Sequence, residues 1–169
     1  MVNGEPGFRM SYLQSRDALL DMLDQAYNRR AWHGTNLRGS LRGLTAKQAA
    51  WRPGRGRHNI WELAVHCAYW KYVVTRRLTG GKRGSFPLEG SNFFPRKGGT
   101  DAAWRADVRL LDRMHRELRR VVAAFPPSRL SRHPEKSKFD FRATIVGAAA
   151  HDFYHAGQVQ LIKALRPKP

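Results

Sequence analysis

Residues 141–165, FRATIVGAAAHDFYHAGQVQLIKAL, are the stretch that decides the fold predicted for this chain. The stretch contains no proline and is too long for a strand, so it is predicted to be a helix that ends before Pro167. Apolar and small residues lie around most of its circumference. A helix with so little polar surface is expected at the centre of a helical bundle or at a second interface.

Two histidines stand four residues apart within this helix, His151 and His155. Positions i and i+4 share one helix face, with Cβ atoms about 6 Å apart, so both imidazoles can reach one metal ion. Their neighbours are small, including Ala148, Ala156 and Gly157, which leaves room for a third ligand and a water molecule. The alternative is two histidines on a solvated or packed face, because an isolated HxxxH pattern is a weak signal.

The third candidate ligand is His66, in the apolar helical stretch of residues 59–70. It shares a face with Leu63 and Trp70, and a buried imidazole without partners costs about 1–3 kcal/mol. A metal ion and one hydrogen-bond acceptor would satisfy both ring nitrogens, although a core histidine bonded to a carbonyl or a tyrosine is the alternative. Three neutral histidines with an open fourth position are common in catalytic zinc sites. Such binding is expected to weaken below about pH 6.5, since the ligands must be deprotonated.

Four helices are predicted, over residues 11–31, 59–78, 101–125 and 141–165, and no strand alternation is visible. Asn59 followed by Glu62 is typical of a capping box, and the glycines from position 80 end that helix. A short helix is expected near residues 45–49. Four long helices predict an all-α four-helix bundle, and the length of 169 residues suits one domain over residues 1–169.

The connection over residues 80–99 is long and rich in glycine and proline, which is typical either of disorder or of a functional lid. Phe86, Phe93 and Phe94 favour a loop that packs on the rest of the protein.

The composition is strongly basic, with 31 Lys and Arg against 13 Asp and Glu and a net charge of +18. Scattered positive charge indicates either a solvated surface or a polyanionic partner such as nucleic acid, and it also suits an acidic or phosphorylated small substrate. The single cysteine, Cys67, excludes an internal disulfide framework. No signal peptide and no membrane span are visible, so a cytoplasmic protein without membrane contact is expected.

Three segments together resemble the DinB-like superfamily: the stretch 31–45 with AWHG and LRGLT, the stretch 57–66 with RHNIWELAVH, and the stretch 144–158 with HDFYH and a final Gln. The resemblance implies a four-helix bundle, often homodimeric, that binds a divalent metal through His66, His151 and His155. It also implies an activity such as thiol transfer, although many members have no known activity.

Other polar residues are candidates for supporting roles. His33 is a candidate for the mouth of the site, Asp152 and His115 for contacts behind the ligands, and Gln158 for orienting a bound water.

Two function hypotheses remain open. The first is a metal-dependent enzyme, a thiol transferase that uses a low-molecular-weight thiol or a hydrolase on a small molecule, with zinc, nickel or iron. The second is a basic helical protein that binds nucleic acid or another polyanion and whose metal site is structural or vestigial.

Overall fold

The computed structural model describes residues 15–135 and 137–167. The helices are α1 (Arg16–Tyr27), α2 (Leu37–Ser40), α3 (Ala46–Ala50), α4 (Ile60–Thr79), α5 (Asp101–Ala123) and α6 (Phe141–Leu165), with a 3₁₀ turn at Pro127–Arg129. No strand forms in the described part of the chain, and the all-α class predicted from the sequence is confirmed. None of its helices has the length and apolar character needed to cross a membrane.

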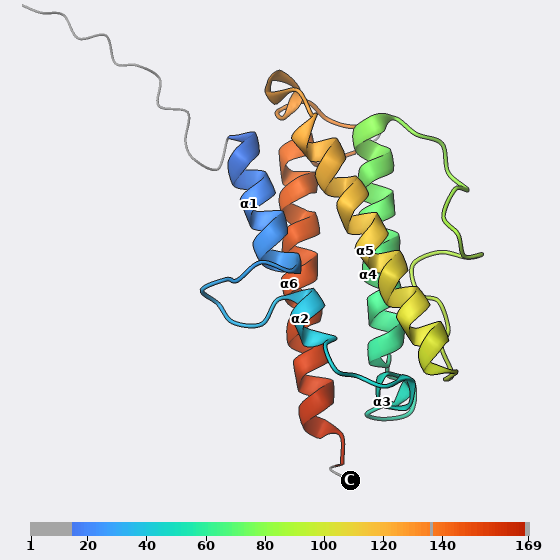
Figure 1. Cartoon of the computed structure of the whole chain (residues 1–169). Helices are drawn as coiled ribbons and strands as arrows, with labels where there is room; N and C mark the ends of the chain where they lie inside the picture. Colours follow the sequence, from blue (N-terminus) through green and yellow to red (C-terminus); the bar gives the residue numbers. More distant parts are fainter. Residues whose placement is uncertain (1–14, 136, 168–169) are drawn as a thin grey trace, which may run out of the picture.

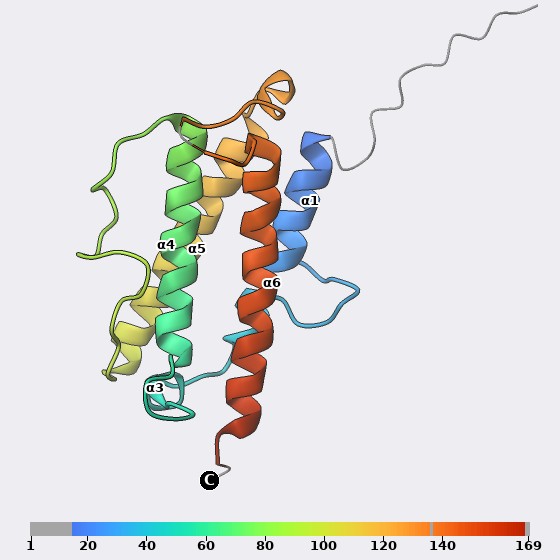
Figure 2. The same ribbon diagram turned by 180° about the vertical axis from the view of Figure 1, so that it is seen from behind.

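The four long helices pack in a closed ring, called the bundle below. Helix α4 contacts α5 and α6, and α1 contacts the same two helices from the other side. Figure 1 shows α5 in front of α4, the short α2 against α6 part-way along its length, and the short α3 at the lower end of α4. The reverse view in Figure 2 brings α4 and α6 to the front, side by side. Residues on facing sides of these two helices can therefore build one site.

The helix boundaries follow local sequence signals. Asn59 and Glu62 form the predicted capping box of α4, and Gly80 ends the helix in the left-handed conformation at φ 70°. Thr45 and Gln48 form a second capping box, which starts α3 close to its predicted position. Since these caps satisfy backbone N–H groups that helix ends leave free, they fix where each helix begins.

Helix α1 is the long helix whose end differs most from the prediction. It ends at Tyr27, before the predicted end at residue 31, and the predicted start at residues 11–14 lies outside the described residues. The N–H groups of Asn28 and Arg29 both donate to the carbonyl of Asp24, which closes the last turn. The brief α2, capped by Asn36, was not predicted because it is a single turn.

The loop over residues 80–99 packs on α4, as its phenylalanines predict. The Phe86 and Phe94 rings lie 5.3 and 5.5 Å from the ring of Tyr69. Phe93 stacks on the His66 ring, with 4.0 Å between centroids, and also on His58 at 3.7 Å. The loop therefore covers one side of His66.

Candidate metal centre

The three predicted ligands come together between α4 and α6. His66 projects from α4, and His151 and His155 project from consecutive turns of α6. The Nε2 atom of His151 lies 3.0 Å from Nε2 of His66 and 3.1 Å from Nε2 of His155. His66 and His155 are buried and His151 is half-buried. All three rings thus point the same nitrogen at one small volume.

Hydrogen bonds at Nδ1 of His66 and His155 determine which ring nitrogen carries the proton. Nδ1 of His66 is 2.9 Å from the backbone oxygen of Asn92, and Nδ1 of His155 is 2.7 Å from Oε1 of Gln158. Because a carbonyl oxygen only accepts, each Nδ1 carries the hydrogen and each neutral ring keeps a lone pair on Nε2. His151 can donate to only one of these two nitrogens, so lone pairs face one another without a hydrogen between them. A cation at their centre would remove this repulsion.

The geometry fits a transition-metal ion. Zinc–nitrogen bonds are about 2.0–2.1 Å, which places two nitrogens of a tetrahedral site about 3.3 Å apart. The distances of 3.0 and 3.1 Å between Nε2 atoms are close to that value. Three neutral imidazoles suit zinc, nickel and iron alike, and they leave further coordination positions for a substrate or water.

The electrostatic surroundings keep the three histidines neutral. Burial lowers the pKa of His66, with a further contribution from His58. Burial, followed by the charges of His155 and His66, lowers the pKa of His151 to about 3. Burial and then the charge of His66 lower the pKa of His155 to about 4, against the opposing effect of its hydrogen bond to Oε1 of Gln158. His151 and His155 therefore keep the neutral form that a metal ligand needs well below the pH of about 6.5 that the sequence suggested, and the pKa of His66 is shifted in the same direction.

Asn92 is a site residue that the sequence analysis missed. Its backbone has a φ of 63°, and its carbonyl orients His66 while its side-chain oxygen accepts a hydrogen bond from Nε1 of Trp70, at 3.0 Å. Asparagine is one of the few non-glycine residues that tolerate the left-handed region. This conformational preference was the only signal of Asn92 in the sequence, and it does not indicate which histidine its carbonyl would contact.

The four candidate supporting residues have different surroundings. Gln158 contacts His155 directly, and its amide nitrogen also donates to the hydroxyl of Tyr154, at 3.0 Å. Asp152 is buried, and its Oδ2 accepts from Lys71 of α4 instead of from an imidazole or an arginine. His33 is exposed and packs edge-on against Phe153, with 4.4 Å between ring centroids.

His115 lies in a different part of the core from the three histidines. Its ring stacks on Tyr27, with 3.8 Å between centroids, and burial lowers its pKa to about 2. Asp24 is the carboxylate nearest its Nε2, at 4.0 Å.

Two cavities flank the histidines. The larger has a volume of about 770 Å³, and its walls include Phe93, Tyr154, His155 and Gln158. The smaller, of about 260 Å³, is mostly apolar, and its walls include Trp70, Phe139 and His151. A molecule bound in either cavity would touch one of the three histidines.

The sequence model of the DinB superfamily matches residues 27–159. This chain belongs to the DinB superfamily. The match includes all three histidines, Asn92 and Gln158, so the whole centre of this DinB-superfamily protein lies in the shared region. A comparison with curated proteins found no match, and a comparison with solved structures found none either.

We predict that this DinB-superfamily protein binds one divalent ion per chain through the three histidines. Replacing His66, His151 or His155 by Ala removes one of three neutral donors and should lower the affinity by more than the roughly 10–100-fold typical of a residue that only orients a ligand. Titration with zinc and metal analysis of untagged protein measure affinity and stoichiometry. His33→Ala, which changes an exposed histidine, is the matched control. Unchanged affinity and stoichiometry in His151→Ala would show that these are not the ligands.

Acid is predicted to destabilise the metal-free protein before it protonates the histidines of the folded state. A histidine in the unfolded chain has a pKa of about 6.5, whereas the folded pKa is about 3 for His151 and about 4 for His155. Their contribution to stability is complete above pH 6.5 and is lost as the pH falls towards 4, because the unfolded chain takes up protons first. Between pH 7.5 and 5 the free energy of unfolding should fall by on the order of 1–2 kcal/mol per histidine. Urea unfolding measures it, and equal stability at both values would contradict the assignment.

Proposed function

We propose that the protein is a divalent-metal-dependent enzyme that acts on a small molecule. The observation that supports it best is the convergence of three histidine Nε2 atoms beside an open cavity. A structural metal site is closed by four protein ligands, whereas three histidines leave a position for a reacting group. A metal bound there would lower the pKa of a coordinated thiol or water towards neutrality.

Thiol transfer is the reaction that we place first, ahead of hydrolysis. A transfer has two substrates, a low-molecular-weight thiol and an electrophile, and both cavities reach the histidines. Cys67 does not supply the thiol in this proposal, because it is fully buried and burial raises its pKa well above the ordinary value. The thiol would therefore come from a separate molecule. The metal in this proposal is zinc, nickel or iron.

The chain's own residues would prepare the site in three ways. Asn92 and Gln158 hold the rings of His66 and His155 with their lone pairs inward. Phe93 covers the face of His66 and lines the larger cavity, so it would keep water from that side. The loop over residues 80–99 would act as a lid through this contact.

The alternative is a polyanion-binding protein with a structural metal, which the net charge of +18 supports. Nucleic-acid binding driven by scattered charge would weaken steeply as salt rises, whereas turnover of a small neutral substrate would not. Salt dependence therefore separates the two functions.

We also propose a homodimer, formed through an exposed apolar stripe on α6. Tyr154, Leu161 and Leu165 follow one another along one side of this helix and are 63%, 60% and 57% exposed. A second copy covering them would also narrow the larger cavity, which Tyr154, Leu161 and Leu165 help to line. Light scattering at micromolar concentration should give twice the chain mass, and Leu161→Lys should give a monomer. A monomer mass for the unchanged protein would contradict this proposal.

The test of the enzyme proposal is metal-dependent consumption of a thiol together with an electrophile. Turnover should require added metal and should disappear with a chelator. It should also disappear in His155→Ala, because all three histidines are needed to hold the metal whose open coordination position binds the reacting group. His33→Ala should retain it. Phe93→Ala should reduce turnover by more than it reduces metal affinity, because Phe93 covers His66 without ligating. If thiols, esters and amides all fail while nucleic acid binds tightly at physiological salt, the alternative function replaces this one.

A further inference from the structure

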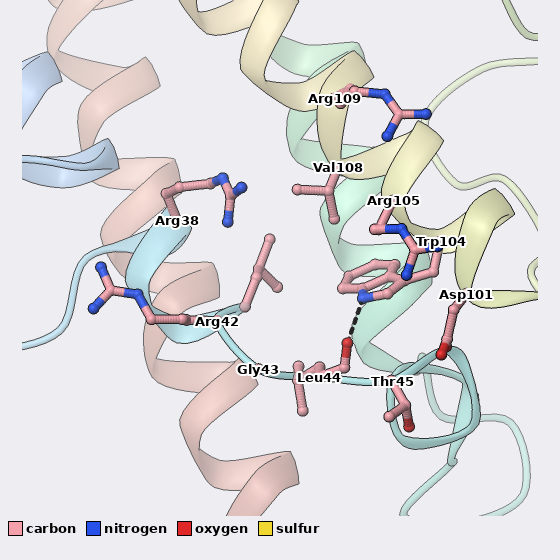
Figure 3. A pocket seen from close by; sticks show the side chains of 11 residues that line it. Arg38, Arg42, Gly43, Leu44, Thr45, Asp101, Trp104, Arg105, Val108 and Arg109 are labelled. Atoms are coloured by element: carbon pink, nitrogen blue, oxygen red, sulfur yellow. Dashed lines mark hydrogen bonds between the residues drawn. The ribbon is translucent and has the colours of Figure 1, made fainter.

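A third cavity, with no lining residue in common with the two cavities at the histidines, lies between α5 and the stretch from α2 to α3. Its volume is about 550 Å³. Figure 3 shows Arg38 and Arg42 on one wall and Arg105 and Arg109, from α5, on the opposite wall. Arginines thus approach one space from two separate parts of the chain.

Only part of this positive charge is matched by carboxylates of the described residues. Arg38 donates to Oδ1 of Asp112, at 2.9 Å. Within the described residues, no carboxylate oxygen lies within 4 Å of a guanidinium nitrogen of Arg42, Arg105 or Arg109. Asp101 also lines the cavity, but its Oδ1 accepts from the backbone N–H of Ala46, at 2.6 Å. With Asp101 and Asp112 both counted against the four arginines, two positive charges remain.

The floor between the arginines is apolar and held in place. It is formed by Leu41, Leu44, Trp104 and Val108. Nε1 of Trp104 donates to the backbone oxygen of Leu44, at 2.8 Å, which ties α5 to the segment before α3 (Figure 3). Since Trp104 and Val108 are almost fully buried, the floor belongs to the core and does not depend on a ligand.

We propose that this cavity binds a small organic phosphate, an ester with a flat or apolar body and one phosphate group. A phosphate monoester carries about −1.5 to −2 charges at pH 7, which matches the two unmatched positive charges. Guanidinium groups bind phosphate oxygens through paired N–H donors. The volume lies within the range of about 300–1,000 Å³ that is usual for small-molecule sites. An apolar floor favours a ligand with an organic body over a free inorganic ion.

The same chemistry is offered by a free phosphate ester and by the backbone of a nucleic acid. A nucleic acid would follow the whole exposed arginine face of α5, including Arg113 and Arg116 outside the cavity. Of these four arginines of α5, a small ester would depend only on Arg105 and Arg109, which line the cavity. These two pairs of arginines lie on one helix and are all exposed, so they form a matched comparison.

The experiment uses calorimetry with four probes at about 0.15 M salt: adenosine monophosphate, adenosine, inorganic phosphate and a short single-stranded oligonucleotide without terminal phosphate. The unchanged protein should bind the monophosphate at least about tenfold more tightly than adenosine or inorganic phosphate, since each lacks half of the contacts. The Arg105→Gln/Arg109→Gln variant should bind it about tenfold or more weakly. The control Arg113→Gln/Arg116→Gln should stay within about twofold.

Several outcomes would overturn the proposal. Equal losses of affinity for the monophosphate in the two double variants would assign its binding to diffuse surface charge. If the oligonucleotide also bound tightly and lost affinity equally in both variants, the surface would be assigned to nucleic acid. No binding of the monophosphate up to about 10 mM would remove the site altogether. Both variants keep the three histidines. If the monophosphate instead bound a metal held by the histidines, its affinity would be unchanged in both variants, and this result would also overturn the proposal. Circular dichroism checks that both variants fold.

Discussion

The ion pair of Lys71 and Asp152, buried between α4 and α6, is the contact on which the rest of the structure depends. Both side chains are at most 2% exposed, and Lys71 also lies over the ring of Tyr27, with 4.9 Å to its centroid. Burial raises the pKa of Asp152, against the opposing effects of Lys71. Because a buried charge without its partner is costly, α4 cannot slide along α6 without a large loss of stability. Because His151 directly precedes Asp152 in the sequence, the ion pair also keeps His151 opposite His66.

The site is therefore assembled from local and distant parts. The two histidines of α6 are placed by a single helix, while His66 needs the packing of α4 on α6 and a carbonyl from the loop over residues 80–99. The loop is held by aromatic contacts to α4, so its position follows from the same core. The centre thus combines histidines carried by two long helices with one side that is covered by a loop.

The arginines of the protein have different surroundings. Several arginines are matched by carboxylates, such as Arg96 with Asp107 and Arg119 with Asp24. Others gather around a cavity with an apolar floor, away from the histidines. The 31 basic residues thus include arginines paired with carboxylates and, among the unpaired ones, a group that lines a concave region. Composition alone does not distinguish these two arrangements, because it carries no information on position.

The sequence by itself determined the long helices α4, α5 and α6 and the caps of α4, since periodicity, Asn59 with Glu62 and the glycines after residue 79 act within a few residues. It also selected the three histidines, because their spacing and apolar faces are local properties; their ligation of a metal stays a prediction. Only the tertiary structure decided that Asp152 meets Lys71, that Asn92 orients His66, and that His115 lies elsewhere in the core. Such contacts join residues far apart in the chain and depend on the register of packed helices, which no local pattern encodes.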